Sequence, residues 1–210
     1  MPKPALRPLA VLLAALTLAS PAVAAPVTWK VDPAHTEVGF DVRHFFTKVH
    51  GVFHDTQGTI VFDEQDPTAI KVDASARVAS VDTGNRNRDS DLQTPDFFNA
   101  ATDSILSFRS TKVEKTGKSK YKVTGDLTMR GVTKQVVFDA EFLGSSTVSI
   151  EGKSWGAKAG FSATTVVNRQ EFGINWNKAL DNGGFMLSDD VDVTISLETV
   201  KKKPEAPAAK

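Results

Sequence analysis

The chain has 210 residues, of which 40% are apolar and 24% charged, a composition typical of a globular protein. Lys and Arg number 25, as do Asp and Glu, so the formal charge is zero and provides no overall field that would attract nucleic acid. The absence of cysteine excludes disulfides, thiolate metal sites and a cysteine nucleophile.

The first residues follow the order of a secretory signal. Lys3 and Arg7 precede an uncharged run rich in Leu and Ala over residues 9–19, and Ala22-x-Ala24 is a small-residue cleavage pattern. The apolar run is about half a membrane span, which favours cleavage after Ala24 over an uncleaved anchor. We expect residues 1–24 to be a signal peptide, residues 25–200 to form one domain, and the protein to be periplasmic.

From about residue 28 to residue 200, apolar and polar side chains alternate, as in strands with one dry and one wet face. Eight runs carry this pattern: Glu37–Phe46, Gly51–Asp63, Ile70–Val78, Ser104–Glu114, Tyr121–Met129, Thr133–Gly144, Trp155–Val167 and Val191–Val200. The alternation places Phe46 and Trp155 on the inner face. Eight such strands predict an all-β domain, either a sandwich or a closed barrel, and the period does not choose between them.

The segment Val81–Asp103 breaks the alternation. It predicts a short helix near Asn85–Leu92 and a turn near Pro95–Asn99, with Thr94 as a helix N-cap before proline. Phe97 and Phe98 argue for an ordered segment because both rings require burial. We interpret this segment as a lid across one end of the domain.

Phenylalanine dominates the inner faces, since the chain has 13 Phe but one Tyr and three Trp. Several inner positions are Ala or Gly, which either interdigitate with Phe in a filled core or leave a channel. Composition alone favours the filled core. His44 shares the inner face of the first run, but a lone inward histidine is usually a core residue. Arg88 in the lid is explained equally well as part of a capped, solvated helix. Arg169, after the seventh run, is explained equally well as one partner of an ion pair in a loop.

Motifs for catalysis are missing from the sequence. The four histidines lie between His35 and His54 without H-E-x-x-H, and there is no G-x-S-x-G, G-x-x-x-x-G-K or G-x-G-x-x-G. We therefore expect no enzyme activity, no metal site and no cofactor. Two alternatives remain: an isomerase or hydrolase that uses His44 with Asp89 or Arg169, and a ligand-free stress-protective module. Residues 201–210, rich in Lys, Pro and Ala, are expected to form a disordered tail.

Several ordered segments resemble the YceI family of secreted or periplasmic polyisoprenoid-binding proteins. They are VDPAHTEVGF at 31–40, GVF at 51–53, VDTG with RDxxL over 81–92, Phe97-Phe98, GDLTMRGVTK at 125–134 and NRQEFG at 168–173. Thr36 departs from the serine that the family often carries, but the hydroxyl is kept. The resemblance implies an extended lipocalin-like barrel of eight antiparallel strands with a helical lid segment. It reverses the expectation of a filled core, because the family's lumen holds a long apolar chain.

The resemblance also assigns site residues. The apolar lining of the lumen maps to Phe40, Val42, Phe97, Phe98, Phe108, Leu127, Phe138 and Phe161. Contacts near the lipid head group map to His44, Asn85, Arg88 and Arg169. The expected function is binding and carriage or sequestration of a long-chain isoprenoid lipid, such as a polyprenyl phosphate or a quinone. The expected partners are this lipid and, transiently, a membrane, with no nucleic acid. The protein is expected to be a monomer or a homodimer.

Overall fold

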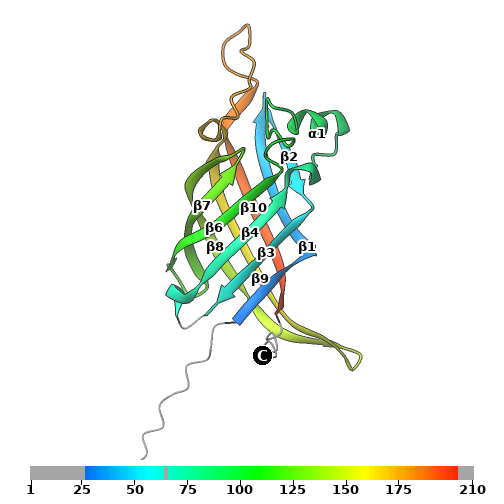
Figure 1. Cartoon of the computed structure of the whole chain (residues 1–210), viewed down its shortest axis with the longest axis vertical. Coiled ribbons are helices and arrows are strands. Elements are labelled where there is room, and N and C mark those ends of the chain that lie inside the picture. Colours follow the sequence, from blue (N-terminus) through cyan, green and yellow to red (C-terminus); the bar gives the residue numbers. More distant parts are fainter. Residues whose placement is uncertain (1–26, 64–65, 203–210) are drawn as a thin grey trace, which may run out of the picture.

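The computed structural model describes residues 27–63 and 66–202 (Figure 1). The expected signal peptide and residues 203–210 of the expected tail lie outside the described residues. Ten strands run in chain order: β1 (Val27–His44), β2 (Thr47–Phe53), β3 (Thr56–Phe62), β4 (Lys71–Arg77), β5 (Val81–Asp82), β6 (Ile105–Lys115), β7 (Lys120–Met129), β8 (Val132–Ile150), β9 (Lys153–Asn168) and β10 (Leu187–Lys201). The helical segments are η1 (Pro67–Ala69), η2 (Val78–Ser80), α1 (Arg86–Leu92) and η3 (Arg169–Phe172). β10 thus includes Lys201, which the sequence assigned to the tail.

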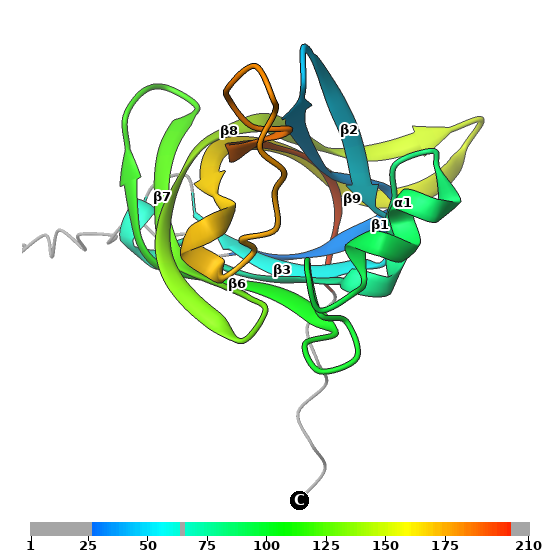
Figure 2. The same cartoon turned by 90° about the horizontal axis from the view of Figure 1, so that it is seen from above.

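The strands form a closed antiparallel barrel. Their order in the sheet is β10-β9-β8-β7-β6-β4-β3-β1-β2-β5, and β10 also pairs with β1, which closes the ring (Figure 2). β2 and β3 both pair with β1, one after the other along its length, and therefore act as one bent strand. β5 has only two residues and does not count as a full strand of the barrel. Eight long strands therefore surround the axis. This confirms the lipocalin-like barrel over the sandwich.

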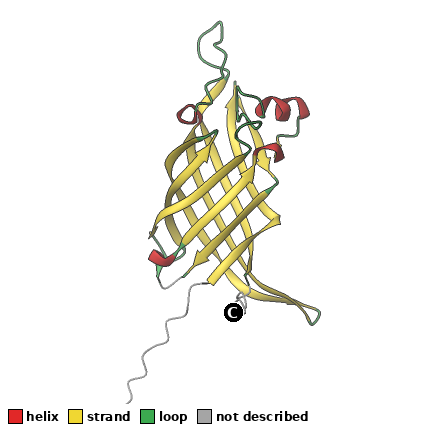
Figure 3. Ribbon diagram, viewed as in Figure 1, coloured by secondary structure: helices red, strands yellow, loops and turns green. Residues whose placement is uncertain are grey.

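The two ends of the barrel differ. One end, here called the mouth, carries α1, η3 and the connection between β9 and β10 at residues 173–186 (Figure 3). The opposite end, the base, carries η1 and the first residues of β1. From the base, the β8–β9 hairpin extends away from the barrel as an arm (Figure 1). Across residues 27–63 and 66–202, no helix combines the length and apolarity needed to cross a membrane.

Three sequence expectations about strands are wrong in detail. β1 begins at Val27 rather than Glu37, because a register shift between Val31 and Thr36 interrupts its alternation. Phe46 is not inward: β1 ends at His44, and the following turn leaves Phe46 95% exposed. Trp155 is also outside, at 57% exposure, because the β8–β9 arm has left the barrel at that position.

Aromatic side chains fill the base. The Phe62 ring lies 4.5 Å from Phe142, 5.4 Å from Phe161 and 5.8 Å from Tyr121, measured between centroids. These rings belong to a core cluster that also includes Trp29, which is 6% exposed. Tilted and edge-to-face pairs at these distances are favourable beyond the area they bury. The base is thereby closed with apolar groups.

Glycine allows two phenylalanine rings to lie flat against the barrel wall. A Cβ atom on Gly125 would stand 2.5 Å from Phe108 Cζ and 2.5 Å from the backbone oxygen of Arg109. A Cβ atom on Gly51 would stand 2.7 Å from Phe40 Cε1. The interdigitation of small residues with Phe is therefore present, but it lines the wall and does not fill the interior.

The helical segment follows the predicted boundaries. Asn85 is the N-cap of α1, and its side chain accepts hydrogen bonds from the amides of Asn87 and Arg88. Residues 95–98 form the predicted turn, but Thr94 is not an N-cap, because its hydroxyl donates backward to the Asp91 carbonyl at 2.7 Å. The segment lies at the rim of the mouth (Figures 1 and 2).

Candidate functional site

A cavity of about 850 Å³ occupies the inside of the barrel. Its lining includes Phe62 and Tyr121 at the base and Arg88, Trp176 and Leu187 at the mouth. Such a volume lies at the upper end of the about 300–1,000 Å³ range of small-molecule sites. The cavity therefore runs along the barrel and is floored by the aromatic cluster of the base.

All eight residues that the sequence assigned to the apolar lining do line this cavity: Phe40, Val42, Phe97, Phe98, Phe108, Leu127, Phe138 and Phe161. They come from six separate segments of the chain, and the closed sheet brings them together. Phe138 and Phe161 are buried, and the others are half-buried. Phe108 and Phe138 meet edge to face at 5.1 Å. Their contact with a lipid stays a prediction.

Aromatic rings from distant segments meet at the mouth. Phe97, which follows α1, lies 5.3 Å from Trp176 in the β9–β10 connection. Phe98 contacts Phe53 edge to face at 5.6 Å. Arg130, in the turn between β7 and β8, donates to the carbonyl of Pro95 at 2.7 Å and to the carbonyl of Gly173. One guanidinium thus ties both segments that surround the mouth.

Three of the four predicted head-group residues form the polar rim of the cavity. His44, Asn85 and Arg88 all line it. Arg88 is held in place by Thr83, because its Nε donates to the Thr83 hydroxyl at 2.7 Å and its Nη2 to the Thr83 carbonyl at 2.9 Å. The Thr83 amide and hydroxyl in turn donate to Asp89 Oδ1. The mouth therefore combines a fixed guanidinium with an imidazole and an amide, beside the carboxylates of Asp91 and Asp96, which also line the cavity.

Arg169, the fourth predicted head-group residue, lines the cavity but is 5% exposed. Its nitrogens donate to the carbonyls of Ser188, Ile174 and Trp176 and to Asp189 Oδ1. Burial lowers the pKa of the guanidinium, and Asp189 opposes that shift. The structure shows Arg169 holding the loop that carries Trp176, and its contact with a head group stays a prediction.

Sequence reasoning missed several residues of the mouth. Trp176, Met186 and Leu187 line the cavity, but they lie in or next to a connection without periodicity. Arg130 belongs to the segment at 125–134 that carried the family resemblance, yet no role was assigned to it. Its place in the short turn between β7 and β8 gives no sign in the sequence that it reaches across to Pro95 and Gly173.

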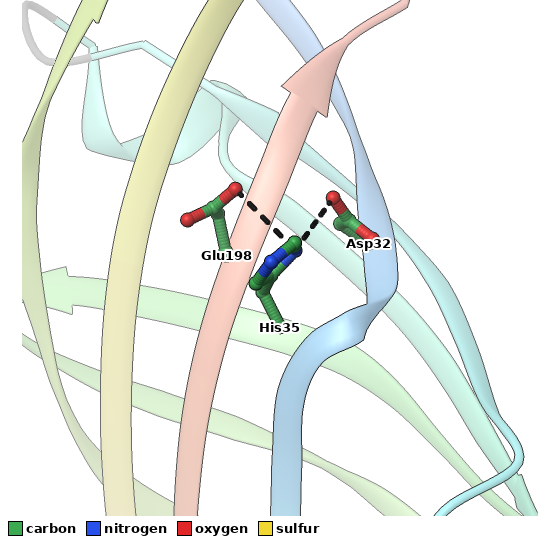
Figure 4. Close-up of side chains that lie close together, drawn as sticks. All are labelled: Asp32, His35 and Glu198. Atoms are coloured by element: carbon green, nitrogen blue, oxygen red, sulfur yellow. Dashed lines mark hydrogen bonds and ion pairs between the residues drawn. The ribbon is translucent and has the colours of Figure 1, made fainter.

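Histidines and carboxylates outside the cavity lie in separate close pairs. His50 Nδ1 lies 3.2 Å from Asp41, and His54 Nε2 lies 3.4 Å from Asp82, so the two imidazoles do not converge. Within the described part of the chain, the one group spaced closely enough to hold a metal ion is Asp32, His35 and Glu198, at the bulge of β1 (Figure 4).

A lysine already occupies the space between the carboxylates of that group. Lys158 Nζ lies 3.1 Å from Asp32 Oδ2 and 2.8 Å from Glu198 Oε1. Burial raises the pKa of Asp32, but hydrogen bonds from Lys158, His35 and the Ala34 amide outweigh it and hold the pKa below its ordinary value. None of these side chains lines the cavity. We interpret the cluster as an ionic clamp on the bulge.

Comparison with known proteins gives consistent matches. The YceI-like domain family matches residues 29–199. A UPF0312 protein of Photorhabdus laumondii is 38% identical over 193 residues, covering 90% of this chain and 94% of the relative. Protein YceI of Escherichia coli O157:H7 is 37% identical over 187 residues, covering 88% of this chain and 92% of the relative.

Solved structures share the fold. A Campylobacter jejuni YCEI protein matches with a TM-score of 0.63 at 35% identity, covering 82% of this chain and 96% of that chain. Burkholderia cenocepacia BcnA matches with a TM-score of 0.69 at 23% identity, covering 80% and 98%. A polyisoprenoid binding domain from Saccharophagus degradans, described as implicated in plant cell wall breakdown, matches with a TM-score of 0.62 at 13% identity, covering 84% and 99%.

Proposed function

The chain belongs to the YceI-like family, and from that premise we propose that it binds one long-chain isoprenoid lipid inside the barrel and carries or shields it in the periplasm. The observation that carries the proposal is the cavity of about 850 Å³, apolar along its length and polar at its rim. The name of the Saccharophagus degradans domain, which has the same fold, adds support from a relative.

A linear apolar chain suits the shape of the cavity. The lining extends from the ring cluster at the base to Phe97 and Trp176 at the mouth, so a tail can lie along the axis. His44, Asn85 and Arg88 at the rim would then face the polar end of the lipid. A few fixed polar groups beside an apolar cavity are the usual way in which a site sets the orientation of its ligand.

The relevant competitor for such a ligand is the membrane. Burying a forty-carbon tail from water at about 0.8 kcal/mol per carbon would sum to about 30 kcal/mol, which exceeds the limit of about 20 kcal/mol for non-covalent affinity. In the cell, the tail already lies in hydrocarbon, so its transfer from bilayer to barrel is close to neutral. Selectivity therefore depends on the shape of the cavity and on the rim.

A binding role also agrees better with the geometry than the His44-dependent isomerase or hydrolase. Asp89 accepts hydrogen bonds from the amide and the hydroxyl of Thr83, and Arg169 is engaged with loop carbonyls and Asp189. Asp89 has no hydrogen bond or ion pair with His44 in the described part of the chain. We therefore propose a binding protein and not an enzyme.

Native mass spectrometry of the protein purified from its own periplasm tests the proposal. We expect a stoichiometric adduct that organic extraction releases and identifies as a prenyl lipid. A protein that is empty, and that also takes up neither a prenyl alcohol nor a prenyl phosphate when these are added, would refute lipid binding and favour the ligand-free module. Turnover that depends on His44 and survives loss of lipid binding would favour the enzyme.

A further inference from the structure

Two exposed phenylalanines stand beside the mouth. Phe46, in the turn between β1 and β2, is 95% exposed, and Phe185, in the β9–β10 connection, is 58% exposed. The two turns that carry them are neighbours in space, because the amide of Phe45 donates to the carbonyl of Met186 at 2.8 Å. Exposed apolar side chains that cluster beside an opening are typical of interaction sites.

The backbone fixes both positions. Phe45 has a φ of 53°, and Arg43 Nη1 donates to its carbonyl at 2.7 Å. In the other segment, Phe185 pairs with Ala179 in a β-bridge, and the Met186 amide donates to the Lys178 carbonyl at 2.9 Å. The two rings are therefore presented by hydrogen-bonded turns.

The residues next to these two rings connect them to the cavity. His44, Met186 and Leu187, the residues next to the two turns, all line it. His44 pairs with Leu187 across β1 and β10. A molecule leaving the cavity on this side would pass from the lining directly to Phe46 and Phe185.

We propose that Phe46 and Phe185 insert into the surface of a lipid bilayer and place the mouth against it for lipid exchange. This inference rests on the proposed function, since it names the surface with which the lumen exchanges its ligand. Arg43 and Lys178 flank the two rings and have no carboxylate partner within the described residues, whereas Lys48 is paired with Asp192 at 2.5 Å. Aromatic side chains next to basic ones suit the interface of an anionic membrane.

A second copy of the chain fits this surface less well. Two phenylalanines bury about 300–500 Å² together, which is below the about 800 Å² per partner of a stable protein interface. Insertion of two side chains into a bilayer needs no matching protein surface. It also gives the weak, reversible attachment that a carrier needs.

Vesicle sedimentation tests the proposal. The probe is vesicles of phosphatidylcholine with phosphatidylglycerol, and the variant is Phe46→Ser combined with Phe185→Ser. The matched control is Trp155→Ser, which removes an aromatic side chain of 57% exposure from the arm at the other end. All three positions are exposed, so folding is expected to be unaffected. We expect vesicle binding to fall about tenfold per phenylalanine removed and to be unchanged in the control.

A second measurement separates this inference from the proposed function. Equilibrium binding of dispersed geranylgeraniol, without vesicles, reports the lumen alone. Loss of vesicle binding with unchanged geranylgeraniol binding supports the inference. Equal vesicle binding by wild type and the double variant overturns it, as does an equal loss in Trp155→Ser. Vesicle binding that depends on Phe46, in a protein that does not bind geranylgeraniol, would retain the docking surface and refute the proposed function.

Discussion

A carboxylate placed in the wall of the lumen should expel an apolar tail. Leu127 suits this test because it lines the cavity and is half-buried, next to Phe108 on the neighbouring strand. In the empty barrel, water in the cavity can solvate the new side chain of Leu127→Asp. We expect the fold to survive at a cost of about 2 kcal/mol, the low end for loss of a leucine.

The loss of affinity has a ceiling that follows from protonation. Desolvating a carboxylate costs several kcal/mol, but the bound state can instead take up a proton. At pH 7 that protonation costs about 4 kcal/mol for an ordinary Asp pKa of about 3.9. Binding of geranylgeraniol should therefore weaken by about 100-fold to 1,000-fold. The deficit should shrink by up to about tenfold for each pH unit below 7, because the free carboxyl then protonates more easily.

Two controls make this result specific. Leu127→Asn introduces a side chain of nearly the same shape as Leu127→Asp, but one that does not titrate. Its loss of affinity should therefore be smaller and should not change with pH. Val137→Asp places the same charge on the outer face of the barrel, where the native side chain is 44% exposed. It should bind like wild type. Binding by Leu127→Asp that equals wild type, or a deficit that does not depend on pH, would refute the assignment of the lumen as the site.

Other predictions concern the groups that hold the mouth and the bulge. Arg169→Met should lower the free energy of unfolding by about 3 kcal/mol, measured with urea, because buried carbonyls lose a charged donor; a change below about 1 kcal/mol would contradict its loop-holding role. Arg130→Gln should speed hydrogen exchange of residues 95–98 and 173–176 without changing exchange at the base. Asp32→Asn should destabilise the protein above about pH 5, and the deficit should shrink as the pH falls below the ordinary Asp pKa of about 3.9, because a carboxyl with a lowered folded pKa contributes stability that is lost as the pH falls through that pKa. A deficit independent of pH would contradict the ionic clamp. Gly125→Ala should cost about 1–3 kcal/mol through the contact with Arg109 O, whereas Gly84→Ala, in open space, tests the cost of positive φ alone.

The barrel and its lining could be predicted from sequence because both depend on short-range patterns. Alternation assigned Phe40, Leu127 and Phe138 to the inner face, and those faces became the cavity wall once the sheet closed. Closure itself could not come from alternation, since a sandwich has the same period. The closed barrel was instead implied by the family resemblance, and the pairing of β10 with β1 confirms it.

The mouth could not be predicted because its contacts are long-range and its loops have no period. Nothing near Arg130 in the sequence indicates Pro95 or Gly173, and nothing near Phe97 indicates Trp176. Alternation also fails where a strand ends or leaves the barrel. The alternation, extended two residues past the end of β1 at His44, predicts that Phe46 points inward. The turn at Phe45 instead directs this side chain into solvent.

Photolabelling tests the central claim, that the lumen holds a prenyl chain, most directly. A geranylgeranyl probe with a diazirine at the end of its tail is irradiated in the protein, and the labelled peptides are sequenced. We expect labels on residues of the cavity wall, among them Phe108, Leu127 and Phe161. Labels confined to the exposed side chains of Leu143, Trp155 and Val166 would place the lipid on the outer surface and contradict the claim.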